Sequence, residues 1–185
     1  MPCPEDSSDA VPTPNPRRAV CARCERPAGA CYCAALTTIE TRSRIVILQH
    51  PREAGMPFGT ARMAHLCLPQ SSLHVGVTWD DSEVLHRACS DPERPAILLH
   101  PGPDARDILQ DPPSAPVTLI ALDGTWPQTR GMVRGNPALA GLPRFSFTPP
   151  EPSRYRIRKE PRAEYVSTIE ALAHALGAIE GDAQR

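Results

Sequence analysis

The sequence has 185 residues, 41% of them hydrophobic, and a formal net charge of −1. This length and apolar content suffice for one α/β domain with a full core, and the charge excludes a globally basic nucleic-acid-binding protein. The charge is nevertheless uneven, because residues 126–162 contain eight basic residues and only two acidic ones. No apolar run is long enough for a membrane span and no signal peptide is evident, which predicts a cytoplasmic protein with no membrane partner and no obligate protein partner.

The first 38 residues contain a predicted tail and a predicted metal site. Residues 1–18 are interrupted by Pro and acidic residues, lack hydrophobic periodicity and are expected to form a disordered tail. The pattern C-x2-C-x6-C-x-C follows within residues 19–38, and in a reducing compartment clustered thiols indicate a metal and not disulfides. The alternative is a set of reduced thiols without metal. We predict a small structural zinc knuckle whose ligands are Cys21, Cys24, Cys31 and Cys33.

Apolar, β-branched runs alternate with helical patterns along the rest of the chain. Strands are predicted at residues 44–49, 73–77, 96–99, 117–122 and 144–147. Helices are predicted from Thr60 to near Pro69, at 80–89, at 104–110, from Trp126 and from Ser167. Strands that alternate with helices indicate βαβ units, so residues 39–185 are expected to form one α/β domain with a mostly parallel sheet.

A ligand site is predicted where the strand ending at Leu122 runs into Asp123. Open α/β sheets bind their ligands at the carboxyl ends of strands, which is where the Asp123 carboxylate would lie. Gly124 permits a tight turn, and Thr125 can cap the helix that follows. Trp126 at the start of this helix is an unusual choice for packing alone. The alternative is an ordinary helix N-cap followed by a core tryptophan.

Two other loops also follow predicted strands. One comes after residues 44–49 and leads into a Gly-Thr helix start, an arrangement that can hold an anionic or carboxylate-bearing ligand. The other comes after residues 96–99 and is rich in Pro and Gly. His50 is also explained as a residue that orients its loop by hydrogen bonding. The two loops and the helix start contain His50, Pro51, Glu53, Thr60, His100 and Pro101.

The C-terminal part contains a basic segment and a capped helix. In an extended segment at 154–159, alternate side chains would share one face that could bind phosphates. The alternative is a solvated edge strand. Ser167 and Glu170 have the spacing of a capping box, which predicts a helix start. An exposed Ser167–Thr168 pair at that start can also serve a ligand carboxylate.

Taken together, these segments resemble the DTW-domain family, the tRNA-uridine aminocarboxypropyltransferases. The resemblance covers about residues 20–178, and the motifs follow the family's order. Gly59 is a departure, because the family pattern has Asn before this threonine. The matching segments are the four-cysteine knuckle at 21–33, QHPRE at 49–53, GTAR at 59–62, DGTW at 123–126, YRIRKEP at 155–161 and STIEA at 167–171.

The resemblance implies a SPOUT-like α/β fold with a C-terminal trefoil knot that holds S-adenosylmethionine. The implied reaction transfers the 3-amino-3-carboxypropyl group of this cofactor to N3 of a tRNA uridine and releases methylthioadenosine. The expected catalytic residues are Asp123 as the base for uridine N3, Thr125, and Trp126 as a stacking surface. The expected cofactor-binding residues are His50, Pro51, Glu53, Thr60, His100, Pro101, Leu122, Asp123, Gly124, Ser167 and Thr168. The expected RNA-binding residues are Arg130, Arg154, Arg156, Arg158 and Lys159.

Two other functions stay open at this point. A SPOUT-type RNA methyltransferase would use the same cofactor and release S-adenosylhomocysteine. A non-catalytic zinc-knuckle RNA-binding protein would explain the cysteines and the basic segment, but it would leave the loops at the strand ends without a role.

Overall fold

A computed structural model describes residues 19–57, 59–155 and 166–181, and every structural statement below refers to these residues. The chain divides into two compact units, Met1–Ala35 and Leu36–Arg185. In the first unit, the described residues contain an isolated bridge between Val20 and Pro27 and two short 3-10 helices, Ala28–Ala30 and Cys33–Ala35. The second unit contains the sheet and all the α-helices described.

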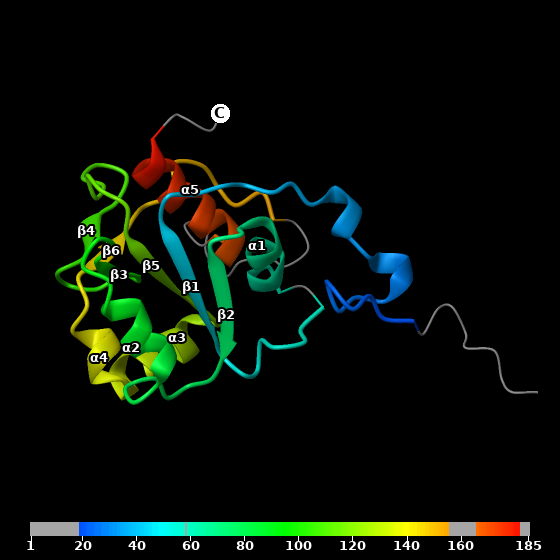
Figure 1. The fold of residues 1–185 in the computed structure, drawn as a ribbon, viewed down its shortest axis with the longest axis horizontal. Coiled ribbons are helices and arrows are strands. Elements are labelled where there is room, and N and C mark those ends of the chain that lie inside the picture. Colours follow the sequence, from blue (N-terminus) through cyan, green and yellow to red (C-terminus); the bar gives the residue numbers. More distant parts are fainter. Residues whose placement is uncertain (1–18, 58, 156–165, 182–185) are drawn as a thin grey trace, which may run out of the picture. The chain divides into compact units, whose positions relative to one another are not determined.

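The second unit is built on a six-stranded sheet in which every pairing is parallel (Figure 1). In spatial order the strands are β2 (Ser71–Val75), β1 (Arg44–Gln49), β5 (Thr118–Asp123), β3 (Ala96–Leu99), β6 (Arg144–Ser146) and β4 (Arg106–Asp107). The central strands β1, β5 and β3 are continuous apolar runs, as expected for strands covered on both faces. The predicted α/β class and parallel sheet are confirmed.

Helices cover both faces of this sheet (Figure 1). Successive side chains of a strand point to opposite faces, so Ile45 and Ile47 of β1 belong to one core cluster and Val46 and Leu48 to the other. The first cluster includes residues of α1 (Ala61–Cys67) and α5 (Thr168–Glu180). The second includes residues of α2 (Glu83–Cys89), α3 (Trp126–Gly135) and α4 (Pro137–Ala140). Two dry layers of core therefore hold the central strands rigidly in place.

The helix predicted at residues 104–110 is wrong, because Arg106–Asp107 form the short edge strand β4 and residues 108–110 form a turn. Pairing with β6 gives the segment backbone partners, and the N–H of Ile108 bonds to the carbonyl of Ser146 at 2.9 Å. The carboxylate of Asp107 accepts a hydrogen bond from the N–H of Leu109, a local contact that competes with helix formation. Tertiary pairing thus overrides the weak helical pattern of the sequence.

The described residues bear only in part on the expected trefoil knot, the expected N-terminal tail and the expected absence of a membrane span. The trefoil knot depends on the path of residues 156–165, which lie outside the described residues, as do residues 1–18 of the predicted tail. Among the described helices, none combines the length and the apolar character that a bilayer span requires.

Strand register brings several predicted residues to the same edge of the sheet. Gln49 at the end of β1 is the register partner of Asp123 at the end of β5. Leu99 of β3 lies opposite Ala121, so His100 follows at the level of the next residue of β5. The N–H of His50 continues the β1–β5 ladder by bonding to the carbonyl of Asp123 at 2.8 Å. The carboxyl ends of the three central strands therefore lie side by side at one edge of the sheet.

Candidate active site

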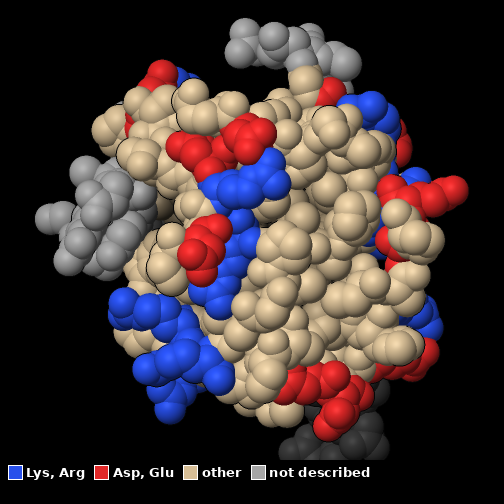
Figure 2. All heavy atoms as spheres, turned by 90° about the vertical axis from the view of Figure 1, so that its left-hand side faces the viewer, with Lys and Arg blue, Asp and Glu red and all other residues tan. Residues whose placement is uncertain are grey.

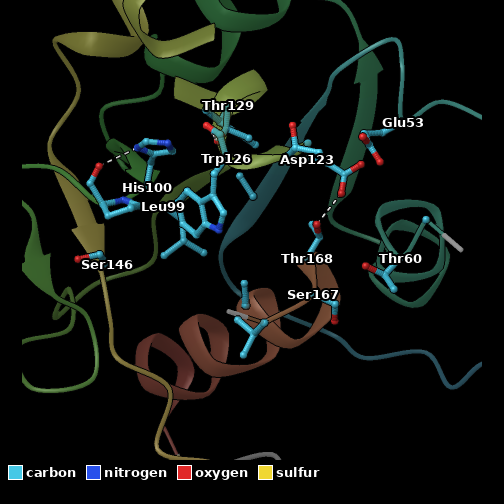
Figure 3. Close-up of a pocket in the computed structure, with 18 of the residues that line it drawn as sticks. Glu53, Thr60, Leu99, His100, Asp123, Trp126, Thr129, Ser146, Ser167 and Thr168 are labelled. Carbon is cyan, nitrogen blue, oxygen red and sulfur yellow. Dashed lines mark hydrogen bonds between the residues drawn. The ribbon is translucent and has the colours of Figure 1, made fainter. Parts of the chain in front are cut away.

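A cavity of about 450 Å³ opens at this carboxyl edge (Figure 3). This volume is within the range of small-molecule sites in proteins. The predicted residues that line it are Glu53, Thr60, His100, Pro101, Leu122, Asp123, Gly124, Thr125, Trp126, Ser167 and Thr168. His50 and Pro51 are not among the lining residues, and the Nδ1 of His50 instead accepts the N–H of Arg52 at 3.2 Å within its own turn.

Asp123 is a buried carboxylate in the cavity wall, with 7% of its surface exposed. Its Oδ2 accepts a hydrogen bond from Nε2 of Gln49 at 2.8 Å, and its Oδ1 accepts one from the hydroxyl of Thr168 at 2.5 Å. Among the residues that the structure describes, no basic side chain forms an ion pair with Asp123. A carboxylate has about four acceptor positions, so two hydrogen bonds leave acceptor capacity for a ligand.

The turn after Asp123 is shaped by a glycine and a capping box. The N–H of Thr125 donates to Oε1 of Gln128 at 2.6 Å, and the Thr125 side chain in turn caps the first turn of α3. A Cβ at Gly124 would lie 3.0 Å from Oε1 of Gln128 and 3.3 Å from Cβ of His50, which is too close for comfortable packing. The absence of a side chain at Gly124 therefore lets α3 start directly at the strand end.

Trp126, the first residue of α3, lines the cavity beside His100, and their ring centroids are 6.0 Å apart at an interplanar angle of 61° (Figure 3). The Nδ1 of His100 lies 2.8 Å from the carbonyl oxygen of Pro101, which can only accept, so Nδ1 carries a hydrogen and the neutral ring presents a lone pair at Nε2. Burial lowers the pKa of His100, and the charges of Arg144 and Arg130 add to this effect against the Pro101 hydrogen bond. The ring is therefore neutral at physiological pH.

The start of α5 completes the cavity from the opposite side. Ser167 is the N-cap: its side chain accepts the backbone N–H of Glu170 and its N–H donates to Oε2 of Glu170 at 2.8 Å, so the predicted capping box is confirmed. The Ser167 hydroxyl also lies 2.7 Å from the same oxygen, to which it donates. Thr168 directs its hydroxyl to Asp123, as Figure 3 shows. The hydroxyl of Thr60 accepts a long hydrogen bond of 3.4 Å from the N–H of Ile169. Two hydroxyl residues far apart in the sequence thus meet at the first turn of α5.

Some residues of the site were missed by sequence reasoning. Gln49 carried a signal that could have found it, because it is a polar residue that directly follows the apolar run 45–48 at the carboxyl end of β1. Tyr155 belongs to a recognised motif but was not assigned to the cavity that it lines. Thr129, Ser146 and Phe147 also line the cavity, and they carried no distinguishing pattern.

The predicted RNA-binding residues are only partly described. Arg130 and Arg154 are exposed, and Arg154 forms an exposed ion pair of 2.9 Å with Glu151. Arg156, Arg158 and Lys159 lie outside the described residues. Figure 2 shows one face of the molecule, on which acidic side chains lie beside much of the basic surface.

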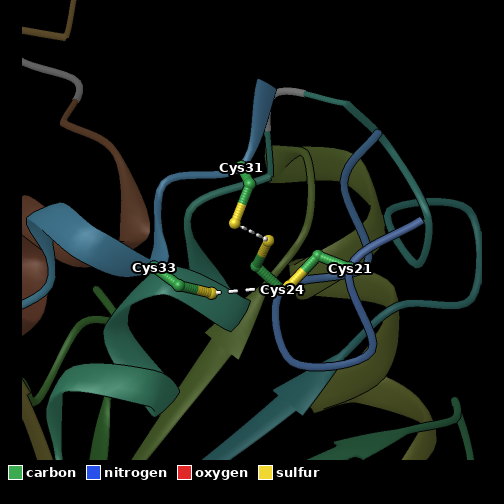
Figure 4. A group of neighbouring side chains, drawn as sticks. All are labelled: Cys21, Cys24, Cys31 and Cys33. Carbon is green, nitrogen blue, oxygen red and sulfur yellow. Dashed lines mark hydrogen bonds between the residues drawn. The ribbon is translucent and has the colours of Figure 1, made fainter. Parts of the chain in front are cut away.

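The four predicted metal-ligating cysteines are brought together within the first unit (Figure 4). Their sulfur atoms all lie within 4.8 Å of one another, and the Cys21–Cys33 and Cys24–Cys31 pairs are each 3.7 Å apart. A tetrahedron with Zn–S bonds of about 2.3 Å has sulfurs separated by about 3.8 Å, so the cluster fits zinc. Backbone N–H groups of Cys24 and Arg23 lower the pKa of Cys21 to about 6, whereas burial and hydrogen bonds with the neighbouring thiols raise the pKa of Cys33 to about 12, so a bound metal would have to displace the proton of Cys33.

Comparison with known proteins places this geometry in a family. The model of the DTW domain matches residues 18–185, almost the whole chain. The chain belongs to the DTW domain family. The signature of this DTW domain, Asp123–Trp126, lies in the wall of the cavity and not elsewhere on the surface. The comparison with solved structures found no match.

Three relatives of this DTW domain have names that describe an activity. The chain is 33% identical to tRNA-uridine aminocarboxypropyltransferase 2 of Drosophila melanogaster, over 90% of this chain and 69% of that protein. It is 30% identical to the protein of the same name from Macaca fascicularis, over 95% of this chain and 63% of that protein. It is 28% identical to tRNA-uridine aminocarboxypropyltransferase A of Arabidopsis thaliana, over 97% of this chain and 78% of that protein. The chain therefore spans only part of the length of each relative.

Proposed function

We propose that this chain transfers the 3-amino-3-carboxypropyl group of S-adenosylmethionine to N3 of a tRNA uridine. The single observation that carries the proposal is the buried Asp123 carboxylate in the wall of the cavity, within the signature of a family whose relatives are named for aminocarboxypropyl transfer to tRNA uridine. A methyl transfer and a purely structural RNA-binding role are the competing functions. The relatives' names favour aminocarboxypropyl transfer over both.

The residues around the cavity fit the chemical groups of S-adenosylmethionine. The anionic side chains of Asp123 and Glu53 suit its positive charges, since opposite charges attract strongly at a partly dry site. The hydroxyls of Thr60, Ser167 and Thr168 and the first turn of α5 suit its carboxylate, because a helix N-terminus favours an anion. The remaining proposed contacts are His100, Pro101, Leu122 and Gly124, with His50 and Pro51 supporting the loop behind them.

In this proposal Asp123 removes the proton from N3 of the uracil ring. Gln49 and Thr168 orient the carboxylate, which lines the cavity and has acceptor capacity beyond these two hydrogen bonds. Bound S-adenosylmethionine supplies the carbon and the leaving group: as the N3–C bond forms, the C–S bond breaks and its electron pair goes to sulfur, giving methylthioadenosine. Three carbons are attached to that sulfur, so the residues of the site must select one by position alone. Thr125 shapes the turn, and Trp126 offers a ring on which a base can stack.

The tRNA contacts and the zinc are part of the same proposal. Arg130 and Arg154 are exposed cations suited to phosphate, and the residues 156, 158 and 159 extend the basic segment in the sequence. The cysteine cluster within residues 19–38 would hold a structural zinc, because four protein ligands leave no open position for catalysis. We further propose that residues 1–18 are a tail and that residues 39–185 form the catalytic domain with a SPOUT-like trefoil knot, in line with the parallel sheet and the docking of α5 on β5.

The proposed function is tested by identifying the small-molecule product of the enzyme with S-adenosylmethionine and tRNA. Aminocarboxypropyl transfer predicts methylthioadenosine, released only when tRNA is present. Release of S-adenosylhomocysteine would contradict the proposal and show a methyltransferase. Titration calorimetry that detects no binding of S-adenosylmethionine would favour the RNA-binding protein.

A further inference from the structure

One carboxylate, that of Glu170, joins the start of α5 to the segment Ser153–Tyr155. Besides the hydrogen bonds from the N–H and the hydroxyl of Ser167, it accepts the hydroxyl of Ser153 at 2.8 Å and the N–H of Arg154 at 2.7 Å. The last two bonds span 17 and 16 residues of sequence, so they are tertiary contacts and are not needed to cap the helix. Glu170 therefore links segment 153–155 to α5 in addition to capping the helix.

Ser153 extends this attachment to the next residue. Its hydroxyl oxygen accepts the N–H of Tyr155 at 3.1 Å while its hydrogen is donated to Glu170. The N–H groups of two consecutive residues, Arg154 and Tyr155, are thus each held by a side chain. Holding two successive backbone groups restrains the backbone from which the Tyr155 side chain extends and so restricts the positions that this side chain can reach.

The charge of Glu170 strengthens the attachment. Burial opposes ionisation, but the hydrogen bonds from Ser167, Ser153 and Arg154 outweigh it and lower the pKa of Glu170 to about 2. The group is a carboxylate at neutral pH, and hydrogen bonds to an ionised acceptor are roughly twice as strong as neutral ones.

Tyr155 is partly buried and lines the same cavity as Trp126 and Asp123. Two aromatic side chains from distant parts of the chain therefore border a cavity that also contains a carboxylate. Aromatic rings stack on nucleobases of any sequence, because every base has a π-face. Both proposed reactants of this site carry a nucleobase, adenine in the cofactor and uracil in the tRNA.

We propose that Tyr155 contacts a nucleobase in the cavity and that Ser153 and Glu170 are positioning residues that hold it there. This assignment rests on the proposed function and adds to it a contact surface and the residues behind it. The ligand class is a planar base, and separate measurements on the cofactor and on tRNA identify which of the two bases is bound.

The first test measures the affinity for S-adenosylmethionine by calorimetry and the affinity for tRNA by filter binding, for wild type and Tyr155→Ala. Removal of one base–aromatic stacking interaction is expected to weaken one of the two affinities by about 5- to 150-fold. A weaker affinity for S-adenosylmethionine would identify adenine as the base that Tyr155 contacts, and a weaker affinity for tRNA would identify uracil. Unchanged affinities for both ligands would overturn the contact, and Tyr155→Leu, which keeps apolar bulk without an aromatic face, should behave like Tyr155→Ala.

The second test asks whether Ser153 acts through Tyr155. Ser153→Ala should weaken the same affinity in the wild-type background and have no further effect in Tyr155→Ala, whereas Ser153→Thr, which keeps the hydroxyl, should restore binding. Ser90→Ala is the matched control, because it removes an exposed hydroxyl that bonds the carbonyl of Arg87 at the end of α2, away from the cavity, and it is expected to change neither affinity. An equal effect of Ser153→Ala in both backgrounds would overturn the positioning role.

Failure of the proposed function is distinguishable from failure of this assignment. Wild-type protein that binds neither S-adenosylmethionine nor tRNA would overturn the function and the assignment together. Wild-type protein that binds both, with Tyr155→Ala equal to wild type, would overturn the assignment alone.

Discussion

Thr168, the first residue of α5, donates a hydrogen bond to Asp123, the last residue of β5, across 45 residues of sequence. Gln49, at the end of the neighbouring strand β1, donates to the other oxygen of the same carboxylate. Asp123 is therefore held from two directions by neutral donors, and its charge is left for a ligand. This arrangement gives the carboxylate a fixed orientation, which a base that removes a proton from a bound substrate requires.

An exchange of side chains separates the chemical role of Asp123 from its structural role. Asp123→Asn can keep both hydrogen bonds, because Gln49 can rotate its amide to accept from the new N–H₂ and the Thr168 hydroxyl can donate to the new carbonyl oxygen. The stability measured by denaturant unfolding should therefore change little while activity falls, and adding Gln49→Glu moves the carboxylate to the neighbouring strand with the hydrogen bond between the two side chains kept. The transfer rate should stay about 10²- to 10⁴-fold low, because the charge is at the wrong position. Recovery of near wild-type single-turnover rates in the double variant would show that Asp123 serves only as a hydrogen-bonding group.

Acid sensitivity should report the hydrogen bonds to Glu170. Its pKa is about 2 in the folded protein against a usual value of 4.5, so its stabilising effect is complete above about pH 4.5 and is lost as the pH falls towards 2. Glu170→Gln should flatten the dependence of stability on pH in this window. The control is Glu83→Gln, because Glu83 lies on the exposed face of α2 in an exposed pair with Arg87. Parallel curves of stability against pH for wild type and Glu170→Gln would contradict the stabilising role of the ionised Glu170 carboxylate.

Metal analysis should find about one zinc per chain, as four thiolate ligands around one ion imply. The Cys21→Ser/Cys31→Ser variant should lose this metal, because it removes one thiol from each of the 3.7 Å pairs. Cys89→Ser is the control, since Cys89 is a free, exposed cysteine outside the cluster. Zinc retained in the double variant would rule out these ligands.

Exposed arginines should act on tRNA affinity and leave the affinity for S-adenosylmethionine unchanged. Arg130→Ala and Arg154→Ala should each weaken tRNA binding and reduce the slope of log affinity against log salt by about 1 for each phosphate that is no longer bound. Arg87→Ala, at an exposed position of α2, is the control variant for the salt dependence of tRNA binding. Salt slopes identical to wild type would mean that these arginines are simply solvated.

The sequence predicted best those elements whose signal is local. The apolar runs at 44–49, 96–99 and 117–122 became β1, β3 and β5 almost unchanged, because buried parallel strands need a continuous apolar stretch. The Ser167–Glu170 capping box likewise depends on residues three apart. Features that depend on distant contacts were missed.

The features that sequence patterns did not predict depend on contacts between residues far apart in the chain. Residues 104–110 contain helix-compatible residues, and the pairing of β4 with β6 together with the local bond from the Leu109 N–H to Asp107 decides against a helix. The bonds from Ser153 and Arg154 to Glu170 join segments whose proximity no periodicity encodes. Within the described part of the chain, the buried Nε2 of His100 has no hydrogen-bond partner, a property of three-dimensional burial that a histidine in a loop does not reveal. Among the described residues, the strands that carry the site could thus be predicted from local sequence, whereas the contacts between the site's residues depend on the tertiary fold.

Mass spectrometry of nucleosides from unmodified tRNA that has been incubated with the protein and S-adenosylmethionine identifies the group that is transferred and the base that receives it. Aminocarboxypropyl transfer predicts a uridine that carries a 3-amino-3-carboxypropyl group, formed in equal amount with methylthioadenosine and about 10²- to 10⁴-fold more slowly with Asp123→Asn. A nucleoside that gains a methyl group, or tRNA that stays unmodified although the protein binds both reactants, would contradict it.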